Sequence, residues 1–195
     1  MVNFYLVKFF LNMKFLNYFF FVIILLNTTQ IKADDRDIQL NNLFKELKTN
    51  NSDITYSIEQ KIWNIWSTHP TDNKLTLRLE EGSKLVVNKQ LSKAIEIFTE
   101  VINKDPNWAE AWNKRATVYY IIGKFQKSQK DIDKVLKLEK RHFGALAGQG
   151  LVNIQLQNYE KAIKSYEKAQ KVYPAMESPK TMIKEINELI KKQSI

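Results

Sequence analysis

The sequence predicts an all-α protein made of helical hairpins that stack side by side. Residues 75–108, 109–142 and 143–176 align without a gap as three repeats of equal length, and such a period is typical of stacked repeat arrays. The chain of 195 residues contains only 5 Gly and 4 Pro, too few for an all-β protein rich in tight turns. Apolar residues recur at helical spacing instead, and 44% of residues are hydrophobic, enough for a folded core.

The side chains at equivalent repeat positions explain how two helices meet inside each repeat. Positions 8 and 20, counted from the start of each repeat, hold small residues: Gly82, Ala116, Gly150, Ala94, Ser128 and Ala162. Two helices approach closely only where side chains are small, and bulkier residues such as Tyr119, Phe125 and Tyr159 are expected to fill the space around that contact. We expect one helix at about positions 2–14 and a second at about positions 18–31 of each repeat. Each hairpin alone leaves an apolar face bare, so neighbouring hairpins must stack to bury it.

Helical segments are also expected on both sides of the repeats. Apolar spacing between residues 37 and 68 predicts a helical pair that ends near His69 and Pro70, because the residue before proline is disfavoured in a helix. We interpret residues 34–74 as a degenerate repeat that covers one end of the array. An amphipathic stripe within residues 177–195 predicts a capping helix at the other end.

Residues 1–33 predict a secretory signal peptide. Lys8 and Lys14 precede an uncharged apolar run over residues 15–26, and the small residue Ala33 stands before the first acidic residue, Asp34. This is the order of a signal peptide's basic region, apolar region and cleavage site. Cleavage after Ala33 would remove three lysines and no acidic residue, which lowers the net charge from +9 to +6.

The alternative to cleavage is a membrane anchor formed by residues 15–31. A spanning helix needs about 20 apolar residues. The apolar run over residues 15–26 is shorter than that, so we favour the cleaved signal. Met13 lies just before the run and is an alternative start to Met1.

The residue inventory argues against an enzyme. The absence of cysteine excludes disulfides, thiolate metal sites and a cysteine nucleophile. The only two histidines, His69 and His142, are far apart and lack companions at ligand spacing, so no metal site is expected. No phosphate loop or nucleophile motif occurs, and Asp131 and Asp133 are interpreted as exposed charges. We therefore expect no catalytic residue and no cofactor.

The repeats resemble the tetratricopeptide repeat (TPR), whose pattern reads Trp-x2-Leu-Gly-x2-Tyr, then Ala-x3-Phe, Ala and Pro. The matching residues are Gly82, Leu85, Leu91, Ala94, Phe98, Val101 and Pro106 in the first repeat, Trp112, Ala116, Tyr119, Gly123, Phe125, Ser128 and Ile132 in the second, and Leu146, Gly150, Tyr159, Ala162, Tyr166, Ala169 and Pro174 in the third. The resemblance covers residues 75–176. It implies a right-handed TPR solenoid of three hairpins, with an N-terminal helical pair and a C-terminal capping helix. Residues 112–120 and 141–146 are also similar to small exported bacterial TPR proteins.

The resemblance implies that the chain binds a protein or peptide. TPR arrays bind partners in a concave groove lined by their first helices, where positions 2, 5, 9, 12 and 13 usually face the partner. The implied groove residues are Leu79, Ser83, Val86, Asn113, Thr117, Tyr120, Ala147, Leu151 and Ile154. Gly148 is added to these candidates because a glycine there can clear space for a ligand chain. One branch of the family grips a peptide's terminal carboxylate through Lys and Asn at positions 5 and 9. Only Asn113 fits that pattern here, so we reject this mode.

Several residues depart from what the repeat pattern needs. Arg115 stands where the pattern has leucine, and Asn153 stands where it has tyrosine and needs a hydrogen-bond partner if buried. Gly144 and Gly148 lie at positions where the repeat pattern requires no small residue. They either clear space for a ligand chain against bare backbone or reflect drift on a tolerant surface.

A basic stripe follows the second helix of the middle repeat: Lys124, Lys127, Lys130, Lys134, Lys137, Lys140 and Arg141. It is interpreted as a solvated convex surface, with docking to anionic lipid or to an acidic partner as the alternative. Nucleic acid is not expected as a partner of an exported protein.

Together these observations predict an exported, periplasmic, non-enzymatic scaffold or assembly factor that binds a peptide or a partner helix in its groove. The alternative is a membrane-associated structural component that docks through its basic convex face, or one held at the inner membrane by residues 15–31.

Overall fold

The computed structural model describes residues 35–48 and 52–193. The described residues fall into two units, one containing residues 35–41 and the other residues 42–48 and 52–193, and the array lies in the second. The predicted signal peptide over residues 1–33 and the alternative anchor over residues 15–31 fall outside the described residues. Among the helices of the described part, none combines the length and the apolar character needed to cross a bilayer.

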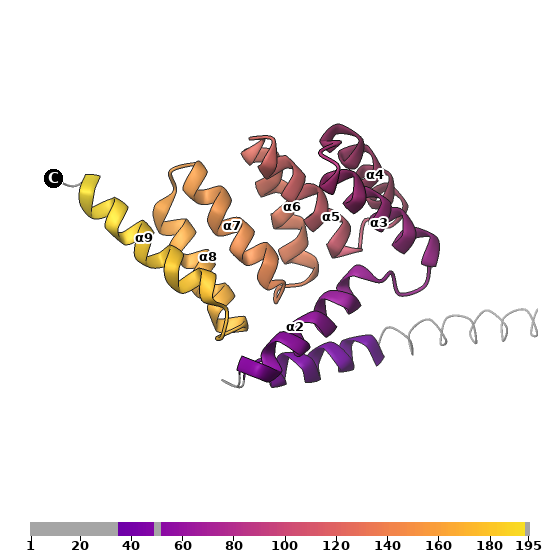
Figure 1. The fold of residues 1–195 in the computed structure, drawn as a ribbon, viewed down its shortest axis with the longest axis horizontal. Helices are drawn as coiled ribbons and strands as arrows, with labels where there is room; N and C mark the ends of the chain where they lie inside the picture. The colour runs from indigo at the N-terminus through magenta and orange to yellow at the C-terminus, as the bar shows by residue number, and fades with distance from the viewer. Residues whose placement is uncertain (1–34, 49–51, 194–195) are drawn as a thin grey trace, which may run out of the picture. The chain divides into compact units, whose positions relative to one another are not determined.

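The regular elements of the described residues are helices, and no strand occurs among them (Figure 1). Residues 35–46 are helical. The helices that follow are α2 (Ser52–Ser67), α3 (Asn73–Val87), α4 (Leu91–Lys104), α5 (Ala109–Ile121), α6 (Phe125–Leu138), α7 (Phe143–Gln155), α8 (Tyr159–Val172) and α9 (Glu177–Gln193). The three predicted repeats are the hairpins α3/α4, α5/α6 and α7/α8, and each hairpin packs on the next. The predicted all-α fold of three stacked hairpins is confirmed.

The turn inside each hairpin has the same backbone geometry in all three repeats. Lys89, Gly123 and Gln157, which occupy the same repeat position, have φ values of 58°, 73° and 58°, in the left-handed region. The residue after each turn donates its backbone N–H to a carbonyl five residues earlier, as in Lys124 N to Tyr119 O at 2.8 Å. This pairing closes the first helix and reverses the chain. A turn of constant length explains why the repeats align without a gap.

Within a hairpin, the glycine on the first helix faces a ring on the second. A Cβ added at Gly82 would lie 2.5 Å from the ring of Phe98, and one added at Gly150 would lie 2.5 Å from Cζ of Tyr166. Both rings are fully buried. The predicted small residue at position 8 is therefore needed because the ring at position 24 fills the space where a side chain would be.

The replacement of the expected leucine by Arg115 is compensated by a buried ion pair. Arg115 Nε donates to Asp131 Oδ2 at 2.7 Å, its Nη2 donates to Asp131 Oδ1 at 2.9 Å, and its Nη1 donates to Thr99 Oγ1 at 3.0 Å. Burial would lower the pKa of Arg115, but the hydrogen bonds and the charge of Asp131 outweigh it and raise that pKa. Asp131 is buried, so its interpretation as an exposed charge was wrong, whereas Asp133 is exposed as expected.

Asn153 finds the hydrogen-bond partner that its burial requires. Its side chain is buried, and Nδ2 donates to the backbone carbonyl of Gln149 at 2.8 Å and to Gln129 Oε1 at 3.4 Å. The polar substitution in the third repeat is therefore tolerated because its donor is satisfied.

Helix α2 packs against the loops that join successive repeats. Trp108, between the first two repeats, donates its indole N–H to the backbone carbonyl of Trp66 at 2.8 Å. The Trp66 ring stacks on His142, between the second and third repeats, with ring centres 4.0 Å apart and planes 7° apart. Trp63 covers Gly144, where an added Cβ would lie 2.6 Å from the indole. The bare backbone at Gly144 is therefore covered by the protein's own tryptophan.

Candidate partner-binding groove

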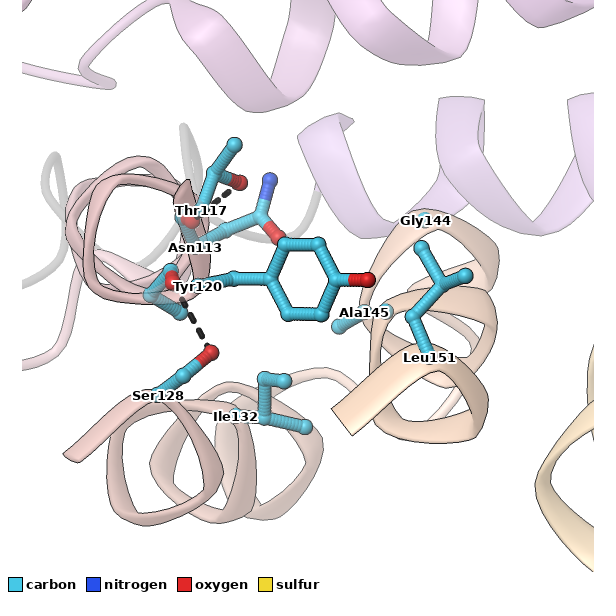
Figure 2. Close-up of a pocket in the computed structure, with 10 residues that line it drawn as sticks. Asn113, Thr117, Tyr120, Ser128, Ile132, Gly144, Ala145 and Leu151 are labelled. Carbon is cyan, nitrogen blue, oxygen red and sulfur yellow. Dashed lines mark hydrogen bonds between the residues drawn. The ribbon is translucent and has the colours of Figure 1, made fainter. Parts of the chain in front are cut away.

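A cavity of about 80 Å³ opens between α5, α6 and α7 (Figure 2). Its lining comes from the first helices of the second and third repeats and from the helix between them: Asn113, Ala116, Thr117 and Tyr120 of α5, Ser128 and Ile132 of α6, and Gly144, Ala145, Gly148 and Leu151 of α7. Figure 2 shows the Tyr120 ring reaching across from α5 toward α7, above Ile132. No charged side chain is among the residues that line the cavity.

The cavity exists because the middle repeat lacks the ring that its two neighbours carry. Phe98 and Tyr166 occupy position 24 of the first and third repeats and lie against glycine. The middle repeat has Ile132 at this position and Ala116 opposite it. An isoleucine leaves more space than a ring. Gly148 on the facing helix leaves that space open, since even a Cβ there would meet only Cδ1 of Ile132, at 3.7 Å.

Three polar side chains at the cavity donate hydrogen bonds within the protein. Asn113 Nδ2 donates to Glu110 Oε2 at 3.1 Å, and Thr117 Oγ1 donates to the backbone carbonyl of Asn113 at 3.0 Å. Ser128 Oγ donates to the backbone carbonyl of Ala116 at 2.8 Å. The Asn113 amide oxygen and the Thr117 hydroxyl oxygen keep accepting capacity, so the rim of the cavity suits a partner that donates hydrogen bonds.

Glu110 fixes the orientation of the Asn113 amide. The Glu110 side chain is buried, and its Oε2 lies 3.0 Å from Nε2 of His142. The other ring nitrogen of His142, Nδ1, accepts the backbone N–H of Ala145. Lys114 Nζ lies 3.2 Å from Oε1 of Glu110. Burial alone would raise the pKa of Glu110, but the hydrogen bond with His142 and the charge of Lys114 outweigh it and hold the pKa below its ordinary value. Glu110 is therefore an ionised acceptor near neutral pH.

The comparisons with known proteins agree with this architecture. The family model of the tetratricopeptide repeat matches residues 109–142 and 144–176. A TPR repeat-containing protein of Rhizobium etli is 32% identical over 155 residues, which is 79% of this chain and 74% of that protein. The chain belongs to the TPR family. Proteins of this family are interaction modules without enzymatic activity, and the chain is a non-enzymatic protein-interaction module.

Other TPR proteins match over shorter segments. Hsp70-Hsp90 organizing protein 1 of Glycine max is 27% identical over 95 residues, 49% of this chain but only 17% of that protein. The solved structure of the first TPR of Spaghetti (RPAP3), bound to the HSP90 peptide SRMEEVD, superposes with a TM-score of 0.59 at 23% identity. It covers 60% of this chain and 93% of that one. At this identity the likeness shows that the fold is a TPR solenoid.

Half of the ten candidate groove residues lie at the cavity. These are Asn113, Thr117, Tyr120, Gly148 and Leu151. The other five do not line it: Leu79, Ser83, Val86, Ala147 and Ile154.

The assignment of Leu79 to the groove is corrected, because its side chain is only 1% exposed and belongs to the core between the first two repeats. Ser83 is half-buried and donates its hydroxyl to the carbonyl of Leu79 at 3.0 Å. Val86 packs against the same core, and Ala147 and Ile154 pack against the core of the third repeat.

Four cavity residues were not predicted from the sequence: Ala116, Ser128, Ile132 and Ala145. Gly144, which also lines the cavity, was predicted to clear space for a ligand chain in only one of two alternatives. Ala116 and Ser128 were assigned only to packing between helices, and Ile132 was matched only to the repeat pattern. The signal was available in the repeat alignment, since position 24 holds a ring in the first and third repeats but not in the second.

The described residues contain no group of three or more His, Asp or Glu side chains that could hold a metal ion. His69 and His142 instead stabilise loops. The Nδ1 atom of His69 accepts the backbone N–H of Asp72 at 2.9 Å, and its Nε2 lies 2.9 Å from Asp105 Oδ2. His142 is held in the same way: its Nδ1 accepts the backbone N–H of Ala145, and its Nε2 lies 3.0 Å from Glu110 Oε2.

Proposed function

We propose that this TPR protein binds a segment of a partner protein along its first helices and seats one apolar side chain of that segment in the cavity between α5, α6 and α7. The observation that carries the proposal is the cavity itself. Its volume of about 80 Å³ is well below the roughly 300–1,000 Å³ of drug-sized ligand pockets. It suits a single large side chain, and its uncharged lining suits an apolar one.

Exposed apolar residues on the first helices of the three repeats support contact with a longer segment. Val87 and Ile121 occupy the same position near the ends of α3 and α5, and they are 81% and 52% exposed. Leu151 on α7 is 37% exposed and also lines the cavity. These residues offer further apolar contacts along the first helices, as in recognition of an amphipathic helix that lies in a groove.

The partner segment need not be a chain terminus. The structure of the first TPR of Spaghetti was solved with an HSP90 peptide. In this chain, positions 5 and 9 of the three repeats hold Leu79, Ser83, Asn113, Thr117, Ala147 and Leu151, without a lysine. No cation at these positions is available to bind a terminal carboxylate, which favours an internal segment.

We also propose that the mature protein is exported to the periplasm as a scaffold or assembly factor. The support is in the sequence alone, in the apolar run over residues 15–26 and the small residue Ala33. N-terminal sequencing of the protein recovered from cell fractions distinguishes the alternatives. Asp34 as the first residue supports cleavage, whereas a membrane-bound chain that retains residues 15–31 supports the anchor.

Photocrosslinking tests the groove proposal. A photoreactive residue placed at Leu151, which lines the cavity, is expected to capture one partner in living cells. The matched control is the same residue at Glu96, an exposed position on α4 away from the cavity. Mass spectrometry then identifies the partner segment. Equal capture of the same protein from both positions would contradict binding at the cavity.

A further inference from the structure

Four lysines of α6 recur at the equivalent positions of α8. They are Lys127, Lys130, Lys134 and Lys137 in α6, and Lys161, Lys164, Lys168 and Lys171 in α8. Within each helix the spacing of three, four and three positions places the four side chains on one face. Both helices are the second helices of neighbouring stacked repeats, so their equivalent positions are expected to point in similar directions. We call these eight residues the lysine face.

The lysine face lies on the opposite side of α6 from the cavity. Ser128 and Ile132 of α6 face the cavity, and a helix turns by about 100° per residue, which directs Lys130 and Lys137 away from it. All eight lysines are exposed apart from Lys134, which is half-buried. A ligand on this face would leave the groove free.

The positive charges of this face are not held in ion pairs within the described chain. None of the eight lysines takes part in the ion pairs found among the described residues. The exposed acidic residues of these two helices are Asp133, Glu160 and Glu167. Asp131 is buried and forms an ion pair with Arg115. Lys127 and Lys134 also lie over the rings of Tyr119 and Trp112, at 5.7 and 5.9 Å.

The chemistry of the face distinguishes a lipid surface from a protein partner. Protein interfaces are anchored by buried aromatic, apolar or arginine side chains. The described residues of α6 and α8 include no exposed large apolar side chain, and all eight cations are lysines. Lysine is a compact charge without the fork that recognises one carboxylate or phosphate, which suits a diffuse layer of negative charge. We propose that the lysine face docks on an anionic lipid bilayer while the groove holds its partner.

Co-sedimentation of the full chain with lipid vesicles tests the proposal. Vesicles of phosphatidylcholine containing about one third phosphatidylglycerol are expected to bind the protein at about 0.1 M salt, where the screening length is about 10 Å. Binding is expected to be lost near 1 M salt, where that length falls to about 3 Å. Pure phosphatidylcholine vesicles report any binding through the apolar N-terminal run, which every variant retains.

Two variants with equal loss of charge make the test specific. The first variant replaces Lys130, Lys137, Lys164 and Lys171 by Gln and keeps Lys127 and Lys134, which lie over the rings of Tyr119 and Trp112. It is expected to weaken binding to the anionic vesicles about 30-fold or more. The control replaces four exposed lysines of α3 and α9 by Gln: Lys74, Lys84, Lys184 and Lys191. It is expected to weaken binding less than about 3-fold, because those side chains lie off the face.

Three outcomes would overturn the proposal. Equal weakening by both variants would mean that net charge alone attracts the chain. Equal binding to neutral vesicles would mean that the lysines are irrelevant. Tighter, lysine-dependent binding to a DNA duplex or to a polyglutamate peptide than to the vesicles would assign the face to that ligand instead.

Discussion

Gly150→Val is expected to lower the free energy of unfolding of the array by about 3 kcal/mol, through overpacking. A Cβ at residue 150 would lie 2.5 Å from Cζ of Tyr166, and the two further methyl groups of valine would enlarge the clash. Tyr166 is 1% exposed, so its ring cannot swing into solvent without opening the hairpin. The measurement is urea denaturation followed by circular dichroism.

Gly148→Val provides the matched control two residues earlier in the same helix. A Cβ at residue 148 would meet only Ile132, at an ordinary contact distance of 3.7 Å. We expect its effect on unfolding to stay below about 1 kcal/mol, since valine also relieves the helix-propensity cost of glycine. If both variants were destabilised equally, the clash with Tyr166 would not be what requires glycine at residue 150.

The stacking of the repeats could be predicted because it is encoded at fixed positions. The period and the small residues at positions 8 and 20 predict where the two helices of a repeat come into contact. The structure accordingly places Gly82 against Phe98 and Gly150 against Tyr166. The same register explains the ion pair that was missed. Arg115 and Asp131 have the same separation in sequence as Gly150 and Tyr166, so a hairpin that brings one pair together also brings the other.

The role of Gly144 could not be predicted in this way. Its neighbour Trp63 lies in α2, outside the repeats, where no period fixes the register between the two segments. The contact depends on how α2 crosses the loops at Trp108 and His142, which is set by tertiary packing. The cavity falls between these cases, because the missing ring at Ile132 is visible in the alignment but its consequence depends on the helices around it.

The double variant Ala116→Gly, Ile132→Phe is expected to fill the cavity while keeping the fold. It gives the middle repeat the glycine and ring that the first repeat has in Gly82 and Phe98. Burial of one large apolar side chain contributes about 1.5–3 kcal/mol, so excluding the anchor should weaken partner binding by roughly 10- to 100-fold. Urea denaturation must first show a stability within about 1 kcal/mol of the unmodified chain, which is expected because the first repeat already accommodates the same glycine and ring at Gly82 and Phe98.

The most direct measurement of the central claim is the affinity of this double variant for the partner segment captured at Leu151, determined by isothermal titration calorimetry beside the unmodified chain. The account predicts that the folded variant loses at least about ten-fold in affinity, because no room is left for an apolar anchor. A folded variant that binds the segment as tightly as before would show that the partner docks elsewhere.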